Sequence, residues 1–328
     1  MKTPKFWQSK NIIAILFWPF SWLYFLGFWL KKILSRPQKI DISTICIGNI
    51  IAGGSGKTPV ALALGKLLTN HHIDFSYLTR GYSTDYSGGY LDKNHQPQFF
   101  LQNTAKNIAD EALLLNEFGN VAISKNRLLG AKLIKQLQPN CQAIILDDGL
   151  QNFTLQYNLK LLVIDGNILF GNCFLLPAGP LRQSIASGLK LADAFVVINN
   201  NHTLQQILAP QNKPIFTANL AIKNLNLFQN KKLFAFCGLA YPQKFFSLLQ
   251  KHHLALQQTQ IFADHYAYKN SDLAKIIDLS ESLNLSPITT KKDWVKFSPQ
   301  MQQKINYLDI ELTFDNPELL VKMIKNIL

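Results

Sequence analysis

The sequence reads STICIGNIIAGGSGKTPVALALGKLL from Ser43 to Leu68. An apolar run typical of a β-strand comes first, followed by a glycine-rich turn and a segment of helical character. This order lets backbone N–H groups converge on phosphate oxygens, and the helix N-terminus adds partial positive charge. Lys57 is placed to reach the β- and γ-phosphates of a nucleotide, and Thr58 is placed to hold Mg²⁺. The pattern therefore predicts that the chain binds ATP or GTP.

The residues expected to bind the phosphates follow one another in the loop. They are Gly53, Gly54, Ser55, Gly56, Lys57 and Thr58. One position departs from the strict motif G-x-x-x-x-G-K-[ST], because the chain has Ile51 where the motif has glycine. An ordinary glycine turn before a helix is the alternative, but the lysine and threonine directly after the last glycine favour the nucleotide.

A second signal lies further along the chain, where residues 143–151 read AIILDDGLQ. An apolar strand that ends in acid, downstream of a phosphate loop, is typical of the strand that supplies a metal-binding carboxylate to the same sheet. We therefore expect Asp147 or Asp148 to hold Mg²⁺ together with Thr58. The sequence leaves open which of the two aspartates does so.

Charge and composition restrict the classes of partner. Of the 328 residues, 33 are Lys or Arg and 20 are Asp or Glu, which gives a net charge of +13. A hydrophobic content of 48% and a charged content of 16% exclude a disordered protein. The basic surplus favours an anionic partner, such as lipid headgroups or a phosphorylated substrate. Nucleic acid is not expected, because the sequence has no basic arm and no RNA-binding or zinc-finger signature.

The N-terminal region predicts attachment to a membrane. Residues 11–30, NIIAILFWPFSWLYFLGFWL, carry no charge, and lysines or arginines lie on both sides of them. About 20 apolar residues can span a bilayer as a helix, but tryptophans prefer the membrane–water interface. Two alternatives therefore stay open: a spanning helix, or a bent segment that lies in the headgroup layer. In both, the nucleotide domain must be cytoplasmic, where ATP is.

Strands that alternate with helices indicate an α/β fold with a parallel sheet covered by helices on both faces, as in P-loop nucleoside triphosphatases. Polar, turn-rich residues 199–214 indicate a boundary, after which a smaller α/β pattern begins. That pattern includes one strand expected over Ile305–Leu312, while residues 83–98 are expected to form a polar excursion. The predicted parts are an anchor over 1–36, a P-loop kinase domain over 37–214 and a smaller C-terminal domain over 215–328.

Several motifs together resemble one family along nearly the whole chain. They are the aromatic N-terminal anchor, GNIIAGGSGKTP (48–59), TRGY (79–82), DE (110–111), DDGLQ (147–151), FGN with LLPAGPLR (170–182), FCGLAYPQKFF (236–246), FADH (262–265) and TTKKD (289–293). This set is similar to that of the tetraacyldisaccharide 4′-kinases of lipid A biosynthesis. The resemblance implies phosphorylation, by ATP and Mg²⁺, of the 4′-hydroxyl of a tetraacyldisaccharide 1-phosphate at the cytoplasmic face of the inner membrane.

The resemblance also assigns roles to residues that local patterns alone would not select. It implies that Asp110 is the base for the attacking hydroxyl and that His265 is its partner, with Lys57 as the third catalytic residue. A neighbouring histidine can orient a carboxylate and share its proton. Substrate contacts are expected from the matching motif positions. These are Arg80, Gly81, Glu111, Gln151 and Arg182.

The chain departs from the family pattern at four positions. Ala112 stands where proline is frequent, Asn152 where histidine is frequent, and Gln183 and Lys291 where acids are usual. Gln183 puts a third metal-binding or charge-balancing carboxylate in doubt. None of the four replaces a residue expected to act in catalysis.

Two other functions remain as alternatives. The first is a membrane-docked P-loop ATPase switch that acts on a protein partner, although the sequence requires no such partner and lacks the N-K-x-D motif of a GTPase. The second is a soluble kinase of a small molecule, in which residues 11–30 would be incidental. Nucleotide hydrolysis without lipid that a protein stimulates would favour the switch. Loss of activity on a micellar substrate after deletion of residues 1–36, with ATP binding kept, would exclude the soluble kinase.

Overall fold

The computed structural model describes residues 4–54, 56–81, 89–93, 97–100 and 110–328. The chain divides into two compact units. The larger unit comprises Pro4–Asn219 and Leu312–Leu328, and the smaller unit comprises Leu220–Glu311. The predicted boundaries at 36 and 214 differ from this grouping, because the anchor segment and the C-terminal residues both belong to the larger unit.

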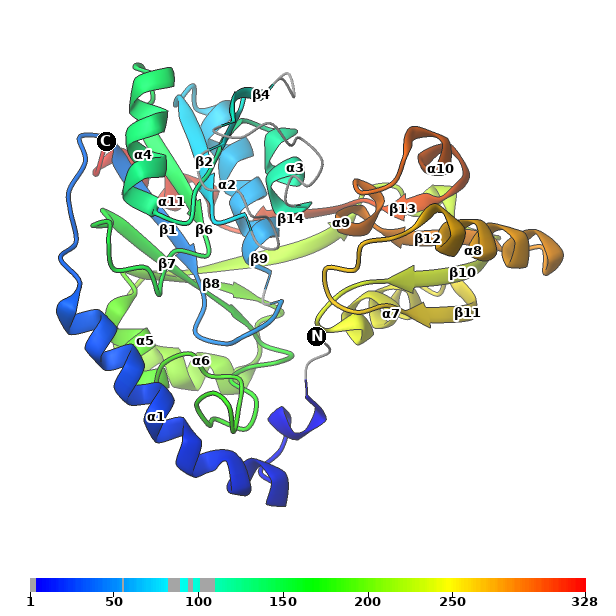
Figure 1. Ribbon diagram of the computed structural model, residues 1–328, viewed down its shortest axis with the longest axis horizontal. Coiled ribbons are helices and arrows are strands. Elements are labelled where there is room, and N and C mark those ends of the chain that lie inside the picture. The colour runs from blue at the N-terminus through cyan, green and yellow to red at the C-terminus, as the bar shows by residue number, and fades with distance from the viewer. Residues whose placement is uncertain (1–3, 55, 82–88, 94–96, 101–109) are drawn as a thin grey trace. The chain divides into compact units, whose positions relative to one another are not determined.

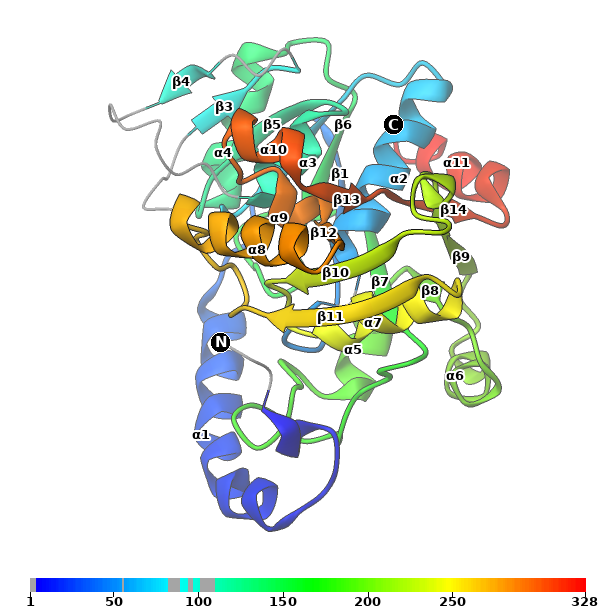
Figure 2. The ribbon, with the colours of Figure 1, turned by 90° about the vertical axis from the view of Figure 1, so that its right-hand side faces the viewer.

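A ten-stranded sheet has the order β14-β9-β8-β7-β1-β6-β2-β5-β3-β4 (Figures 1 and 2). Its strands are β1 (Ser43–Gly48), β2 (Phe75–Thr79), β3 (Gly89–Leu91), β4 (Pro97–Phe100), β5 (Asn120–Ile123), β6 (Ala143–Asp147), β7 (Leu159–Asp165), β8 (Ala194–Ile198), β9 (Ile215–Ile222) and β14 (Ile310–Phe314). The pairs from β9 to β5 are parallel, and β3 runs antiparallel to β5 and β4. The central strands are buried on both faces, as near-continuous apolar runs require.

Helices cover both faces of this sheet (Figure 1). They are α2 (Lys57–Asn70), α3 (Asp110–Asn116), α4 (Arg127–Leu137), α5 (Ile185–Leu191), α6 (His202–Leu208) and α11 (Pro317–Lys325). Side chains of α4 pack with Ile144 and Leu146 of β6, and side chains of α5 and α6 pack with Leu162 and Ile164 of β7. Helix α2 contacts β1 and β6, and α3 and α11 pack against α2. The predicted α/β fold with a helix-covered parallel sheet is confirmed.

The smaller unit has a parallel four-stranded sheet in the order β11-β10-β12-β13 (Figure 2). Its strands are β10 (Lys232–Cys237), β11 (Ala255–Ile261), β12 (Ser286–Thr290) and β13 (Asn306–Leu308), and its helices are α7 (Pro242–Lys251), α8 (Asn270–Ser282), α9 (Lys291–Trp294) and α10 (Pro299–Lys304). Alternate residues of β10 point to opposite faces. Ala235 packs with α7, and Phe234 and Phe236 pack with α8, so the two helices cover opposite faces.

Two local predictions were wrong. The single strand expected over Ile305–Leu312 is two strands, β13 and β14, in different sheets. Asn224 separates them, because its side chain donates to the carbonyl of Tyr307 and accepts from the amide of Asp309. In the stretch expected to be a polar excursion, Gly89–Leu91 and Pro97–Phe100 pair as β3 and β4.

Helix α1 (Ile12–Leu34) lies against the larger unit along one side. Ala14 and Ser21 are buried on this side, and the Ser21 hydroxyl donates to the carbonyl of Leu175. Ahead of the helix, the Trp7 indole donates to the carbonyl of Pro177. The other side exposes a row of large apolar residues. It includes Ile12, Ile15, Leu16, Trp18, Trp22, Leu23, Leu26, Ile33 and Leu34.

Helix α1 is long and apolar enough to cross a membrane, with 23 residues and a mean hydropathy of 1.7 over its most apolar 18-residue window. Only 11% of its most apolar window is buried inside the protein. The predicted apolar N-terminal helix therefore exists, and its exposed side is available to lipid.

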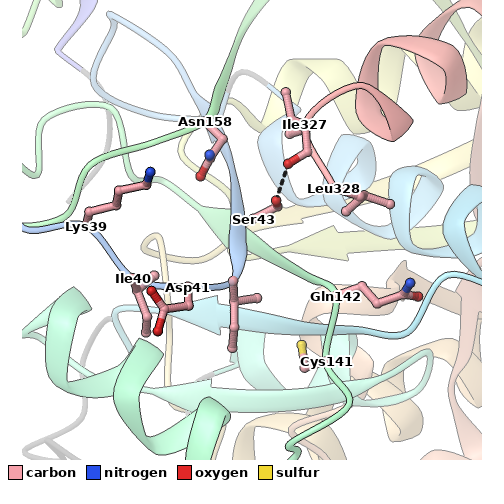
Figure 3. A pocket seen from close by; sticks show the side chains of 10 residues that line it. Lys39, Ile40, Asp41, Ser43, Cys141, Gln142, Asn158, Ile327 and Leu328 are labelled. Carbon is pink, nitrogen blue, oxygen red and sulfur yellow. Dashed lines mark hydrogen bonds between the residues drawn. The ribbon is translucent and has the colours of Figure 1, made fainter.

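A surface cavity of about 310 Å³ opens where β1 and β6 begin (Figure 3). Lys39, Asp41 and Cys141 line it, and the Ser43 hydroxyl donates to the carbonyl of Ile327 across it. The phosphate loop follows the other end of β1. This cavity is therefore not the nucleotide site.

Candidate functional site

The phosphate loop connects β1, which ends at Gly48, to α2, which begins at Lys57. Gly56 precedes the helix with a φ of 87°, and Gly53 has a φ of 107°. Only glycine adopts such backbone angles readily. A Cβ at Gly56 would also lie 2.5 Å from Ile198 Cδ1. Ser55 lies outside the described residues, and the other five predicted loop residues occupy the expected strand–loop–helix connection.

Ile51, the departure from the strict motif, has a structural role. It is buried and forms a β-bridge with Leu181. On either side of it, the Arg182 amide donates to the carbonyl of Ile50 at 2.7 Å, and the Ala52 amide donates to the carbonyl of Pro180 at 2.7 Å. The segment before the phosphate loop is thus joined to the proline-rich loop, residues 175–182.

Lys57 lies between an amide and a carboxylate. Its Nζ donates to Asn49 Oδ1 at 3.3 Å and lies 3.7 Å from Asp148 Oδ1. Both groups hold the ammonium at the loop, where a nucleotide phosphate would meet it. Asn49 is 1% exposed and was not selected from the sequence, although its place in the GNIIAGG motif was a signal.

Thr58 and Asp147 meet directly. Thr58 Oγ1 donates to Asp147 Oδ2 at 2.9 Å. Asp147 is buried at the end of β6, and its Oδ1 has no hydrogen-bond partner among the residues that the structure describes. Burial raises the pKa of Asp147, and the nearby Glu111 carboxylate raises it further. A buried carboxylate with an unpaired oxygen beside a threonine hydroxyl fits Mg²⁺, which takes one or two protein oxygens together with phosphate oxygens and water.

Asp148 faces cations instead. Arg182 Nη1 lies 3.0 Å from both of its carboxylate oxygens and 3.1 Å from Gln151 Oε1. Burial by itself would raise the pKa of Asp148, but Lys57 and Arg182 more than offset this and lower the pKa to about 2. The backbone of Asp148 has a φ of 57°, a left-handed value that aspartate tolerates better than most residues.

Two further contacts complete this cluster. Gln151 Nε2 donates to the carbonyl of Asn49 at 2.7 Å. Arg127, which the sequence analysis did not single out, is 2% exposed and donates to the carbonyls of Ser124 at 2.6 Å and Asp148 at 3.4 Å. The charge of this buried guanidinium also interacts favourably with the carboxylates of Asp147 and Asp148.

The larger unit also contains the remaining predicted site residues. Arg80 is exposed directly after β2, and Gly81 follows with a φ of 69°. Glu111 is half-buried in α3. Asp110 is the first residue of α3, and its side chain lies outside what the structure describes. Gln183 is 3% exposed, so the position where an acid is usual is covered by protein.

His265 belongs to the smaller unit. Its Nε2 lies 3.3 Å from Lys292 Nζ and 4.0 Å from Asp264 Oδ1. The next residue of the TTKKD motif, Asp293, is fully buried and accepts from the amide of Gly238 at 2.8 Å. The motif therefore joins α9, which carries Lys292, to the backbone at Gly238 after β10. The pairing of His265 with Asp110 stays a prediction.

Known proteins match nearly the whole chain. A family model described as tetraacyldisaccharide-1-P 4′-kinase matches residues 13–328. Tetraacyldisaccharide 4′-kinases of Rickettsia felis and Rickettsia canadensis are 37% and 38% identical over 320 residues, which span 97% of this chain and 94% of each relative. The crystal structure of LpxK from Aquifex aeolicus in complex with ATP is similar in fold, with a TM-score of 0.73 and 24% identity, over 96% of this chain and 99% of that one.

Proposed function

The chain belongs to the tetraacyldisaccharide-1-P 4′-kinase family, and on this premise we propose that it transfers the γ-phosphate of ATP to the 4′-hydroxyl of a tetraacyldisaccharide 1-phosphate, a lipid A precursor. The observation that carries this most directly is the contact between Thr58 and Asp147 beside the phosphate loop. It brings together the hydroxyl and the carboxylate that Mg²⁺-dependent phosphoryl transfer needs.

Phosphoryl transfer depends mainly on positioning and on neutralising charge. The loop from Gly53 to Thr58 would hold the β- and γ-phosphates with its backbone N–H groups, and the Lys57 ammonium would neutralise them. Thr58 and Asp147 would hold Mg²⁺, which supplies charge neutralisation at the phosphate oxygens. We assign Asp147 to the metal because Asp148 is already neutralised by Arg182 and Lys57.

The acceptor hydroxyl needs a base and a fixed position. Asp110 would accept its proton, and His265 would orient that carboxylate. Contacts to the phosphorylated sugar are expected from the same motif positions as before. They are Arg80, Gly81, Glu111, Gln151 and Arg182.

The site would work at the cytoplasmic face of the inner membrane. Helix α1 is covered by protein along one side and apolar on the other, an arrangement that suits a helix lying in the membrane interface better than one surrounded by lipid. Ser21 of this helix and Trp7 ahead of it both bind the proline-rich loop. A spanning helix would have to give up these contacts or draw the loop into the bilayer.

The proposal is tested by comparing two rates in the same preparation. Wild-type protein with Mg²⁺ and γ-labelled ATP should label a detergent-dispersed tetraacyldisaccharide 1-phosphate, and hydrolysis of ATP without lipid should be slow. Lys57→Ala should lose the transfer, while Lys135→Ala, which removes an exposed lysine paired with Asp41, should keep it. Fast hydrolysis without lipid that a protein stimulates would favour the ATPase switch instead.

A further inference from the structure

Tyr24 connects the membrane-facing helix to the residue that holds Asp148. Its phenolic hydroxyl donates to the carbonyl of Arg182 at 3.1 Å. Tyr24 lies on the same side of α1 as Ser21, three residues earlier, whose hydroxyl donates to the carbonyl of Leu175 at 2.9 Å. Both hydroxyls therefore bind the proline-rich loop, at its two ends.

The main-chain amide and carbonyl of Arg182 are both hydrogen-bonded. Its amide donates to Ile50, directly before the phosphate loop, and its carbonyl accepts from Tyr24. Its guanidinium binds Asp148 and Gln151. The direction of a planar guanidinium that binds two partners depends on where its backbone lies. Arg182 therefore links the Tyr24 hydroxyl to the carboxylate of Asp148, which lies 3.7 Å from the ammonium of Lys57.

The neighbouring residues of α1 face the opposite way. Trp22 is 62% exposed and Leu23 is 68% exposed, so the side that would enter lipid is separate from the side that holds the loop. Lipid can cover the outer side without disturbing Tyr24. The same helix can therefore fix the protein on a membrane and support the phosphate site.

We propose that Tyr24 is a positioning residue: by holding the main chain of Arg182, it aligns the guanidinium with Asp148 and Gln151 for phosphoryl transfer. This inference rests on the proposed function. The aromatic ring would pack equally well in phenylalanine, so the hydroxyl is the group that acts. Substitution by phenylalanine removes it alone.

The test compares Tyr24→Phe with Ser21→Ala, which removes the other hydrogen bond from α1 to the same loop. Tyr24→Phe is expected to lower kcat for lipid phosphorylation about fivefold, the loss of one hydrogen bond, with the KM for ATP unchanged. Ser21→Ala should keep kcat within about twofold, although both variants should lower the melting temperature by similar amounts. An equal fall in kcat for Ser21→Ala would overturn the inference, because the effect would then be general loosening of the loop.

A double-mutant cycle with Arg182→Lys makes the test specific. If Tyr24 acts through Arg182, Tyr24→Phe should lower kcat no further in the Arg182→Lys background. Fully additive effects would contradict the proposal. Hydrogen exchange at the Arg182 amide provides a readout without activity and should be several-fold faster in Tyr24→Phe than in wild type or Ser21→Ala.

The two claims can fail separately. Wild-type protein that makes no lipid product would overturn the proposed function, and the exchange of the Arg182 amide would then decide whether Tyr24 positions Arg182. Active wild-type protein whose kcat is unchanged by Tyr24→Phe would overturn the inference and leave the kinase assignment intact.

Discussion

Thr58 Oγ1 donates a hydrogen bond of 2.9 Å to Asp147 Oδ2 and thereby joins the first turn of α2 to the end of β6. The two residues are 89 positions apart in the chain. Adjacent parallel strands bring them to one edge of the sheet, where a doubly wound fold places its ligands. In the proposed site this pair would hold Mg²⁺, and Lys57, whose ammonium lies beside Asp148, would neutralise the phosphates.

Asp147 and Asp148 should differ in metal binding. Asp147→Asn is expected to weaken Mn²⁺ binding by about tenfold or more in the presence of an ATP analogue, because it removes charge from the proposed ligand. Asp148→Asn should change the Mn²⁺ affinity much less and act on kcat, because Arg182 loses its charged partner. Electron paramagnetic resonance of free Mn²⁺ measures both. A larger loss of Mn²⁺ affinity in Asp148→Asn than in Asp147→Asn would assign the metal to Asp148.

The hydroxyl of Thr58 should matter more than its methyl group. Thr58→Ala is expected to raise the Mg²⁺ concentration needed for half-maximal activity by about tenfold. Thr58→Ser keeps the oxygen and should restore most of the affinity. A serine variant as impaired as the alanine variant would show that Thr58 acts through packing and not as a ligand.

Two glycines of the phosphate loop should respond differently to alanine. Gly56→Ala is expected to destabilise the fold by about 1–3 kcal/mol, because its φ is 87° and its Cβ would lie 2.5 Å from Ile198 Cδ1. At Gly54 a Cβ would meet nothing within 4 Å among the described residues. Thermal unfolding without nucleotide should therefore place Gly54→Ala close to wild type and Gly56→Ala below it. Equal melting temperatures would contradict the backbone argument.

Both ends of α1 should lie on one side of the membrane. Lys10→Cys and Lys31→Cys, each in a Cys173→Ser background, introduce single exposed thiols, since the other three cysteines are buried. An impermeant maleimide should label both in inverted inner-membrane vesicles and neither in sealed right-side-out vesicles. Labelling of one position in each preparation would show that α1 spans the bilayer.

His265 should contribute to the rate and not to nucleotide binding. His265→Ala is expected to lower kcat about tenfold or more and to leave the dissociation constant of ATP unchanged, because the histidine is assigned to the base. His253→Ala is a matched control, since His253 is an exposed histidine of the same unit with the same φ of 55°. A change in ATP affinity without a change in kcat would assign His265 to the nucleotide instead.

The sequence was sufficient for the central sheet and for the phosphate loop, because both depend on local patterns. Apolar runs predicted the strands that are buried on both faces, and the glycines followed by Lys57 and Thr58 predicted the strand–loop–helix connection. The strand expected over Ile305–Leu312 shows where local patterns end. Its apolar run is continuous in the sequence, but the side chain of Asn224 binds the backbone of Tyr307 and Asp309 between β13 and β14.

The roles of the two aspartates required the fold. Asp147 and Asp148 are chemically identical neighbours, and their difference depends on burial and on Arg182, which is 34 residues away from Asp148. In the sequence, Ile51 is a departure from the motif. Its β-bridge to Leu181 joins two loops that are distant in the chain, so the local pattern could not predict it. Tyr24 gave no signal in a segment dominated by apolar residues.

The most direct test of the central claim is the identity of the product formed from ATP, Mg²⁺ and a detergent-dispersed tetraacyldisaccharide 1-phosphate. Mass spectrometry and ³¹P NMR should show one added phosphomonoester at the 4′-position with wild-type protein. We expect no product with Lys57→Ala and a fall in rate of about 100-fold or more with Asp110→Ala, as for loss of a general base. Absence of the 4′-phosphate from wild-type reactions, despite ATP binding, would contradict the assignment as a lipid kinase.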